Sequence, residues 1–281
     1  LTLDYHYFPD LLGLQQTEEN VSDAIPMPQE QSFDASVLMV SGMPQEQSFD
    51  PSPLIASGIT QVQDAPLYLN GRGVILAFAD TGINYENEVF RRNDGSSRIL
   101  AIWDQTIQEG EPPDGFEIGT EYTRDEINLA LQAENPKELV STIDEDGHGT
   151  RLAALAAGSL IEGGSGYISP AYNADILVVK LKPCKEYLRK YYQIPSGVRA
   201  YATSDIMMAI KYLNSYAKAF QRPIVFCIGM GSNYRDHEGN SVFSRYLNYI
   251  ASQQSRIMVI TGGNEGTASH HFRGRFEEER G

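Results

Sequence analysis

The sequence predicts an α/β fold, with a doubly wound, mainly parallel sheet and helices on both of its faces. Near-continuous apolar runs are typical of strands buried on both faces, and such runs occur at 73–80, 174–181, 223–230 and 256–263. Amphipathic segments alternate with them, and residues 204–220 and 241–254 each carry one apolar stripe at helical spacing. This alternation favours right-handed crossover units in one sheet. Functional sites in such sheets gather at the carboxyl ends of the strands.

Residues 1–70 precede the regular pattern and are expected to form an amino-terminal lead-in segment. Two sixteen-residue units, 27–42 and 43–58, follow one another there and agree at twelve positions. Two copies are too few for a solenoid, which needs at least three stacked units. The prolines of this segment predict a loop with at most short helices. We therefore expect 27–58 to be a peripheral tandem duplication that the core does not need.

The regular pattern runs from residue 71 to residue 281, and we interpret it as one domain. Within it, an insertion is expected at about 94–140. This stretch contains a long polar loop and a predicted helix after Thr123, where Thr123 and Glu126 have the spacing of a capping box. We expect the insertion to be a surface excursion.

Composition and charge exclude several classes of protein. With 281 residues, 41% of them hydrophobic, the chain can bury a large core. A formal charge of −15 and the lack of a basic stripe argue against nucleic-acid binding. No apolar stretch approaches the ~20 residues that a membrane-spanning helix needs. The chain begins with Leu1 and carries no signal segment, so we expect a fragment or a processed form. The oligomeric state stays open.

Asp80 is the first candidate for chemistry. It ends a predicted buried strand and precedes the tight turn Thr81-Gly82, so its carboxylate can orient another group in a crevice. Asp-Thr-Gly is also the signature of aspartic proteases, but these need a second such aspartate. The sequence contains no second Asp-Thr-Gly or Asp-Ser-Gly. An aspartate that serves only the turn fits the motif about equally well.

His148 lies between two glycines, just before a stretch of small residues that predicts a helix. On the first turn of a helix, unpaired N–H groups and the positive end of the dipole disfavour a protonated ring. A ring kept neutral at pH 7 can accept a proton, as a general base must. The alternative, a surface or capping histidine, must also explain the glycines and Asp80. We expect the His148 ring within hydrogen-bonding reach of Asp80, although 68 residues separate them.

Asn264 is the third candidate. It follows the last apolar run, within the glycine-rich segment ITGGNEG at 260–266. Its side-chain amide can project into the same crevice and stabilise a developing oxyanion. By itself, Gly-Asn-Glu-Gly is more often just a turn.

The order of these three residues resembles that of the subtilisin-like serine proteases (subtilases, peptidase family S8). The segments that carry the resemblance are AFADTGINYENEVF, DEDGHGTRLAALAAG and VITGGNEG, and it covers roughly residues 71–281. The family has a triad of Asp, His and Ser, with an Asn in the oxyanion hole. The resemblance implies that Asp80 orients His148, that His148 accepts the proton of the serine, and that Asn264 holds the oxyanion.

The resemblance also implies where substrate binds and what the chain lacks. The residues expected to contact an extended peptide substrate are Gly229, Met230, Gly231, Gly262 and Gly263. Subtilases carry the nucleophile in a Gly-Thr-Ser block well beyond the oxyanion Asn. This chain ends 17 residues after Asn264 and contains no such block. We therefore expect the serine, and the carboxyl-terminal part of a subtilisin-like fold, to lie beyond residue 281.

A narrower likeness concerns the segments DGSSRILAIWDQTI, GTEYTRDEINLAL and GNEGTASHHFRG. They are similar to the clostridial Csp group of subtilases, which is linked to spore germination, and to relatives in gut Firmicutes. Some members have lost triad residues and act as non-catalytic regulators. The sequence therefore leaves two hypotheses: the amino-terminal part of a serine endopeptidase that acts on peptides or proteins, or a pseudoprotease that binds a partner in germination. A secreted or spore-associated location is implied. No cofactor is expected; subtilases often bind calcium, but the sequence shows no ligand cluster of that kind.

Overall fold

The structure, a computed structural model, describes residues 5–7, 52–159, 168–231 and 238–261. Its central element is a six-stranded sheet with the order β4-β3-β5-β2-β7-β8. In that order the strands are Thr120–Thr123, Ile99–Asp104, Asp175–Lys180, Ile75–Asp80, Ile224–Ile228 and Arg256–Ile260. All neighbours are parallel except β4, which is antiparallel to β3. The predicted α/β fold with a mainly parallel sheet is confirmed.

The strands β2, β5, β7 and β8 form where the four apolar runs predict them. β2 is central, because it pairs with β5 on one side and with β7 on the other. All residues of β2 and β5 are buried. A strand that is covered on both faces needs apolar side chains at successive positions, which explains the unbroken runs.

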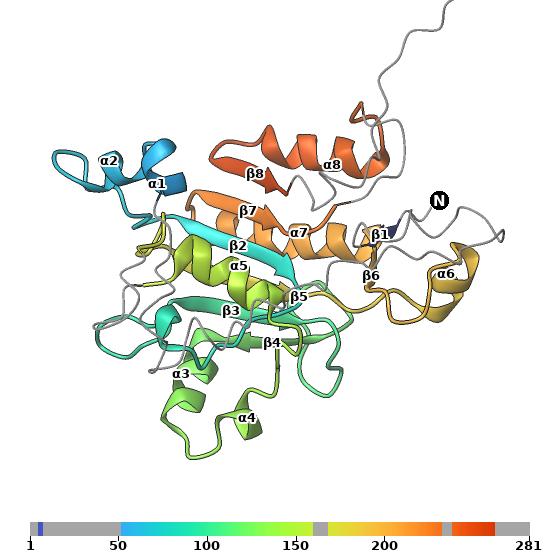
Figure 1. Cartoon of the computed structure of the whole chain (residues 1–281). Coiled ribbons are helices and arrows are strands. Elements are labelled where there is room, and N and C mark those ends of the chain that lie inside the picture. The colour runs from blue at the N-terminus through green and yellow to red at the C-terminus, as the bar shows by residue number, and fades with distance from the viewer. Residues whose placement is uncertain (1–4, 8–51, 160–167, 232–237, 262–281) are drawn as a thin grey trace, which may run out of the picture.

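Helices cover both faces of the sheet, with α5 in front of it and α7 behind it in Figure 1. The helical segments are α1 (Ser52–Ala56), α2 (Ile59–Gln63), the 3-10 turn η3 (Glu88–Phe90), α3 (Arg124–Gln132), α4 (Pro136–Leu139), α5 (His148–Ala157), α6 (Glu186–Tyr191), α7 (Thr203–Ala219) and α8 (Val242–Ala251). Side chains alternate along β2, so Leu76 and Phe78 pack with α3 and α5, whereas Ile75 and Ala77 pack with α7 and α8. None of the helices within the described ranges is long and apolar enough to span a membrane.

The stretch at 94–140 is not the surface excursion that the sequence led us to expect. Within it, β3 is an interior strand between β4 and β5, and all of its residues are buried. Trp103 of β3 packs against Phe116 at 4.6 Å and against Tyr212 of α7 at 5.1 Å between ring centroids. The helix predicted after Thr123 is confirmed as α3, with its capping box to Glu126. This stretch therefore supplies part of the core.

A second, smaller sheet lies beside the main one. β1 (Tyr5–Tyr7) pairs antiparallel with β6 (Ala200–Ala202), which directly precedes α7. Figure 1 shows this pair near α6, at one side of the main sheet. Most of the duplication at 27–58 lies outside the described residues, apart from its end, which contains α1. That the duplication is dispensable stays a prediction.

Parallel strands give the sheet two chemically different ends. Asp80 and Lys180 lie in register at the carboxyl ends of β2 and β5. At the opposite end, Asp175 begins β5 and is surrounded by arginines. Because α5 begins beside the carboxyl end of β2, a histidine at its first position meets the end of that strand.

Candidate active site

The candidate site is a hydrogen-bonded pair of side chains, Asp80 and His148, referred to below as the Asp–His pair. Asp80 is the last residue of β2 and His148 is the first residue of α5. His148 Nδ1 lies 2.7 Å from Asp80 Oδ1. The predicted contact between the two side chains is therefore confirmed. The partner of Asp80 is an imidazole rather than a second carboxylate, so the aspartic-protease alternative does not fit.

Asp80 is fully buried. Its Oδ1 also accepts a hydrogen bond from the backbone N–H of Thr81 at 2.7 Å. Its Oδ2 is buried and has no hydrogen-bond partner among the residues that the structure describes. A buried carboxylate with few donors interacts strongly with its one cationic neighbour, because little solvent or hydrogen bonding screens its charge.

The hydrogen bond to Asp80 raises the pKa of His148 above its ordinary value of 6.5, and burial of the ring opposes this shift without cancelling it. The direction is opposite to the one expected from the helix terminus alone. A full carboxylate charge at 2.7 Å outweighs the partial charge of a helix end. When the neutral ring donates from Nδ1, its lone pair is on Nε2, which is then the nitrogen that accepts a proton. The raised pKa makes that nitrogen a stronger base.

Asp144, which the sequence analysis did not single out, joins the two halves of the site. Its Oδ1 accepts from Thr81 Oγ1 at 2.8 Å and from the Gly147 N–H at 2.9 Å. Its Oδ2 accepts from the N–H of Thr150 at 2.9 Å and from Oγ1 of Thr150 at 2.5 Å. One carboxylate therefore ties the turn after β2 to the first turn of α5. The signal that could have revealed it is an aspartate three residues before a glycine, the spacing at which an Asp side chain organises a turn.

Gly149, the second of the two glycines beside His148, is needed for close packing. Its N–H donates to Thr81 Oγ1 at 2.9 Å. A Cβ at this position would lie 3.1 Å from Gly82 N and 3.2 Å from Asp80 Cβ, and closer still to Gly82 O. Only a glycine lets the first turn of α5 approach β2 closely enough for the Asp–His pair to form.

Of the residues predicted to contact substrate, Gly229 lies directly against the Asp–His pair. A Cβ at Gly229 would lie 2.8 Å from Leu152 Cδ2, 3.0 Å from His148 Cε1 and closer still to Asp80 Oδ2. Met230 is 4% exposed and packs in the core on the α7 side of the sheet. Its side chain is therefore committed to packing, and only its backbone is left to contact a peptide.

The remaining predicted site residues, Gly262, Gly263 and Asn264, lie outside the described residues. Their roles in substrate binding and in the oxyanion hole stay predictions.

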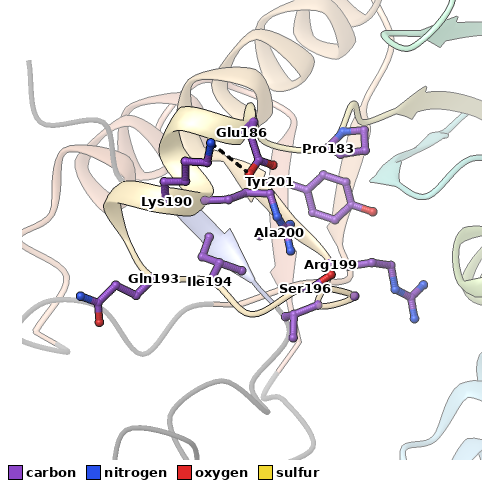
Figure 2. A pocket seen from close by; sticks show the side chains of 12 residues that line it. Pro183, Glu186, Lys190, Gln193, Ile194, Ser196, Arg199, Ala200 and Tyr201 are labelled. Atoms are coloured by element: carbon purple, nitrogen blue, oxygen red, sulfur yellow. Dashed lines mark ion pairs between the residues drawn. The ribbon is translucent and has the colours of Figure 1, made fainter.

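A hollow of about 570 Å³ is formed by α6, β6 and the loop between them. Figure 2 shows Glu186 and Lys190 of α6 facing one another on one side, 3.9 Å apart, with Arg199 and Tyr201 on the side away from Lys190. Arg199 forms an ion pair with Asp146, whose Oδ1 accepts from the His148 N–H at 3.2 Å. The hollow is thus connected to the turn that carries His148.

Tyr201 links the same hollow to the buried carboxylate. It is 5% exposed, and burial raises the pKa of Tyr201 to about 12, with a further contribution from the charge of Asp80. A phenol with so high a pKa stays protonated at neutral pH, so Tyr201 can act there only as a neutral hydroxyl.

Within the described part of the chain, no group of three or more His, Cys, Asp or Glu side chains is placed to hold a metal ion.

Comparison with known proteins assigns the family. Residues 71–277 match the model of the Subtilase family (Peptidase S8). This match covers most of the chain, and the α/β sheet and the Asp–His pair are in keeping with it. The chain belongs to the subtilase family, which is a family of serine proteases.

Several solved structures resemble the chain, two of which are described here, and a search of curated proteins found no match. The Clostridium perfringens CspB protease is 29% identical, with a TM-score of 0.65, over 79% of this chain and 42% of that one. The second is described as an S41 psychrophilic protease and is 20% identical, with a TM-score of 0.41, over 72% of this chain and 50% of that one. The predicted relationship to the Csp group is confirmed by the first match. The chain spans less than half the length of the CspB structure.

Proposed function

We propose that this chain is the amino-terminal part of a serine endopeptidase that hydrolyses peptide bonds in peptides or proteins. The observation that carries the proposal is the hydrogen bond between Asp80 Oδ1 and His148 Nδ1, at the carboxyl end of a central strand. A buried carboxylate that orients an imidazole, and stabilises it when protonated, is two-thirds of an Asp-His-Ser triad.

In this proposal, a serine beyond residue 281 is the nucleophile. His148 Nε2 accepts the proton of the serine hydroxyl as the oxygen attacks the peptide carbonyl carbon, and later returns that proton to the leaving amine. Asp80 holds the ring in the required tautomer and stabilises the imidazolium. Asn264 donates from its side-chain amide to the oxyanion. These steps need no cofactor.

The substrate is proposed to bind as an extended strand along residues 229–231, with further contacts at Gly262 and Gly263. Gly229 supports this position because it lies against both members of the Asp–His pair.

The test compares the longer protein that contains this chain with its His148→Ala and Asp80→Asn variants in a peptide-hydrolysis assay. We expect kcat/KM to fall about 10⁴-fold or more for His148→Ala, a magnitude that comes from subtilisin itself, another member of the family. Asp114→Asn, a matched loss of one exposed carboxylate, is expected to leave kcat/KM unchanged. The 281-residue chain alone is expected to be inert, because it lacks the attacking oxygen. Rapid hydrolysis by that chain would mean a different nucleophile.

A second candidate is a pseudoprotease, in which the same fold binds a partner in spore germination. The sequence feature that favours it is the similarity of DGSSRILAIWDQTI, GTEYTRDEINLAL and GNEGTASHHFRG to the clostridial Csp group, which includes non-catalytic members. A longer protein that is inert, and that stays indifferent to His148→Ala, would favour this candidate. An active longer protein that requires His148 would exclude it.

A further inference from the structure

The amino-terminal end of the sheet carries a hollow that the peptidase proposal does not use. It has a volume of about 700 Å³ and lies next to the start of β5 and the segment before β2. Five arginines line it, namely Arg72, Arg91, Arg92, Arg98 and Arg222. We refer to it as the arginine hollow. The parallel strands separate it from the Asp–His pair, which lies at their other end.

The arginine hollow is strongly cationic in a strongly anionic protein. Its acidic lining residues are Asp94 and Asp175, so the lining carries a formal surplus of three positive charges. The whole chain has a formal net charge of −15. Like charges that are held together cost free energy unless an opposite charge joins them. The local surplus therefore calls for an anion.

Asp175 does not neutralise this surplus, because three arginines share it. Oδ1 of Asp175 pairs with Arg92 and with Arg124 at 2.8 Å, and Oδ2 pairs with Arg222 at 2.6 Å. Burial alone would raise the pKa of Asp175, but the guanidiniums hold that pKa below its ordinary value. An ion pair that serves only the structure needs one guanidinium for each carboxylate, whereas Asp175 has three.

Arg98 adds a buried charge to the same lining. It is 3% exposed, and its guanidinium donates to the carbonyl of Ala174 at 2.9 Å and to that of Val89 at 2.6 Å. No carboxylate neutralises it within hydrogen-bonding distance among the described residues. Burial lowers the pKa of Arg98 to about 10, and repulsion by Arg92 contributes to the shift. The two guanidiniums are therefore close enough to repel one another, and an anion near both would relieve this repulsion.

Donor groups for an anion remain in this lining. The Arg72 side chain is exposed and makes no hydrogen bond or ion pair with the described residues. The Nε–H groups of Arg91 and Arg98 are buried and have no hydrogen-bond partner there. Buried donors are normally satisfied, so two without partners in one lining are unusual.

We propose that the arginine hollow binds a compact oxyanion carrying two or more negative charges, of the phosphate class. Planar guanidiniums present paired N–H donors that match the oxygens of such an anion. The volume of about 700 Å³ is large enough to admit such an anion. The site is independent of the Asp–His pair, so it can be present whether or not the protein cleaves peptides.

The test measures binding of inorganic pyrophosphate to the 281-residue chain by isothermal titration calorimetry, with chloride keeping the ionic strength constant. We expect saturable binding with one pyrophosphate per chain. Arg72→Gln and Arg92→Gln are each expected to weaken the affinity roughly tenfold or more, the usual effect of removing one charged hydrogen-bond donor. The Arg72 side chain has no partner among the described residues to lose, and Arg124 and Arg222 remain on Asp175 after Arg92→Gln, so both variants should fold.

Arg245→Gln is the matched control, because it removes the same charge from an exposed position on α8. We expect it to change the affinity less than twofold. The proposal is overturned if pyrophosphate does not bind, if binding survives Arg72→Gln and Arg92→Gln unchanged, or if Arg245→Gln weakens it equally. Circular dichroism of each variant confirms that it is folded before it is titrated.

Discussion

At the scale of single residues, the contact between Asp80 Oδ1 and His148 Nδ1 couples the protonation of the ring to the charge of the carboxylate. The carboxylate is buried and the ring is about one-third exposed. The ring can therefore exchange a proton with solvent or a substrate, while the group that controls its pKa stays out of contact with water. That arrangement is what a general base needs.

The first prediction concerns this coupling. The pKa of His148 is raised by the hydrogen bond to Asp80, so it should lie above 6.5 in the native chain and fall in Asp80→Asn, which removes the charge but keeps the shape. Proton NMR titration of the histidine Cε1–H signals measures both values. Asp114→Asn should leave the titration unchanged. A native value at or below 6.5 would show that the helix terminus, not Asp80, governs the ring.

The second prediction concerns the close approach of Gly229. Gly229→Ala places a methyl group against His148 Cε1 and Leu152, so it should destabilise the chain by about 1–3 kcal/mol, as overpacking does. It should also displace the ring and lower the pKa of His148 toward its ordinary value. Gly231→Ala is the control, since a Cβ there meets no atom of the described residues within 4 Å. Urea denaturation measures the free energies. Equal effects of the two substitutions would contradict the packing.

At the scale of secondary-structure elements, the sequence predicts those strands that are marked by a local run of apolar residues. β2, β5, β7 and β8 lie in apolar runs, but β3 does not stand out because Arg98 precedes it and Asp104 is its last residue. Both are buried with distant partners: Arg98 donates to Ala174 O, and Asp104 Oδ2 accepts from Thr142 Oγ1 at 2.6 Å. Partners far away in sequence cannot be read from a local pattern, so the core strand looked like part of a polar insertion.

The candidate site likewise has features that the sequence predicts and features that it does not. The motifs around Asp80 and His148 predict the contact between them, because strand end and helix start are local signals. The role of Asp144 depends on which groups its two carboxylate oxygens contact. One oxygen accepts from the turn after β2 and the other from the first turn of α5. The direction of the His148 pKa depends on the balance between burial and a 2.7 Å contact. Neither can be obtained without coordinates.

The third prediction tests the place of β3 in the core. Trp103→Ala should lower the free energy of unfolding by about 3–5 kcal/mol, the usual cost of removing a fully buried large aromatic side chain. Tyr187→Ala, at an exposed aromatic residue of α6, should change it by less than about 0.5 kcal/mol. Trp103 is the only tryptophan of the chain, so the variants are compared by circular dichroism. A small effect of Trp103→Ala would mean that the stretch at 94–140 does not contribute to the core.

At the scale of the whole molecule, the pKa of His148 makes folding stability depend on pH. The folded pKa is raised above the unfolded value of about 6.5, so the folded state binds the proton more tightly than the unfolded chain. The resulting stabilisation is fully present below pH 6.5 and is lost as the pH rises through the folded pKa.

The fourth prediction follows from that linkage. Between about pH 6 and 8, the free energy of unfolding should decrease with rising pH, and this decrease should be smaller in His148→Gln, which has no titrating ring. Urea denaturation at several pH values measures both slopes. Asp114→Asn should keep the native slope. Identical slopes in the native chain and in His148→Gln would show that other groups control the pH dependence.

The bridge made by Asp144 has a consequence for how sequences of this kind diverge. Thr81 and Thr150 both donate hydroxyl protons to the same carboxylate, one from each side of the site. Replacing Asp144 leaves both hydroxyls without this acceptor, and replacing Thr81 also leaves the buried Gly149 N–H without its acceptor, which is costly. Substitutions at these three positions should therefore be correlated in evolution. Among relatives, a changed residue at position 144 should coincide with changes at positions 81 and 150, as is usual for side chains in direct contact.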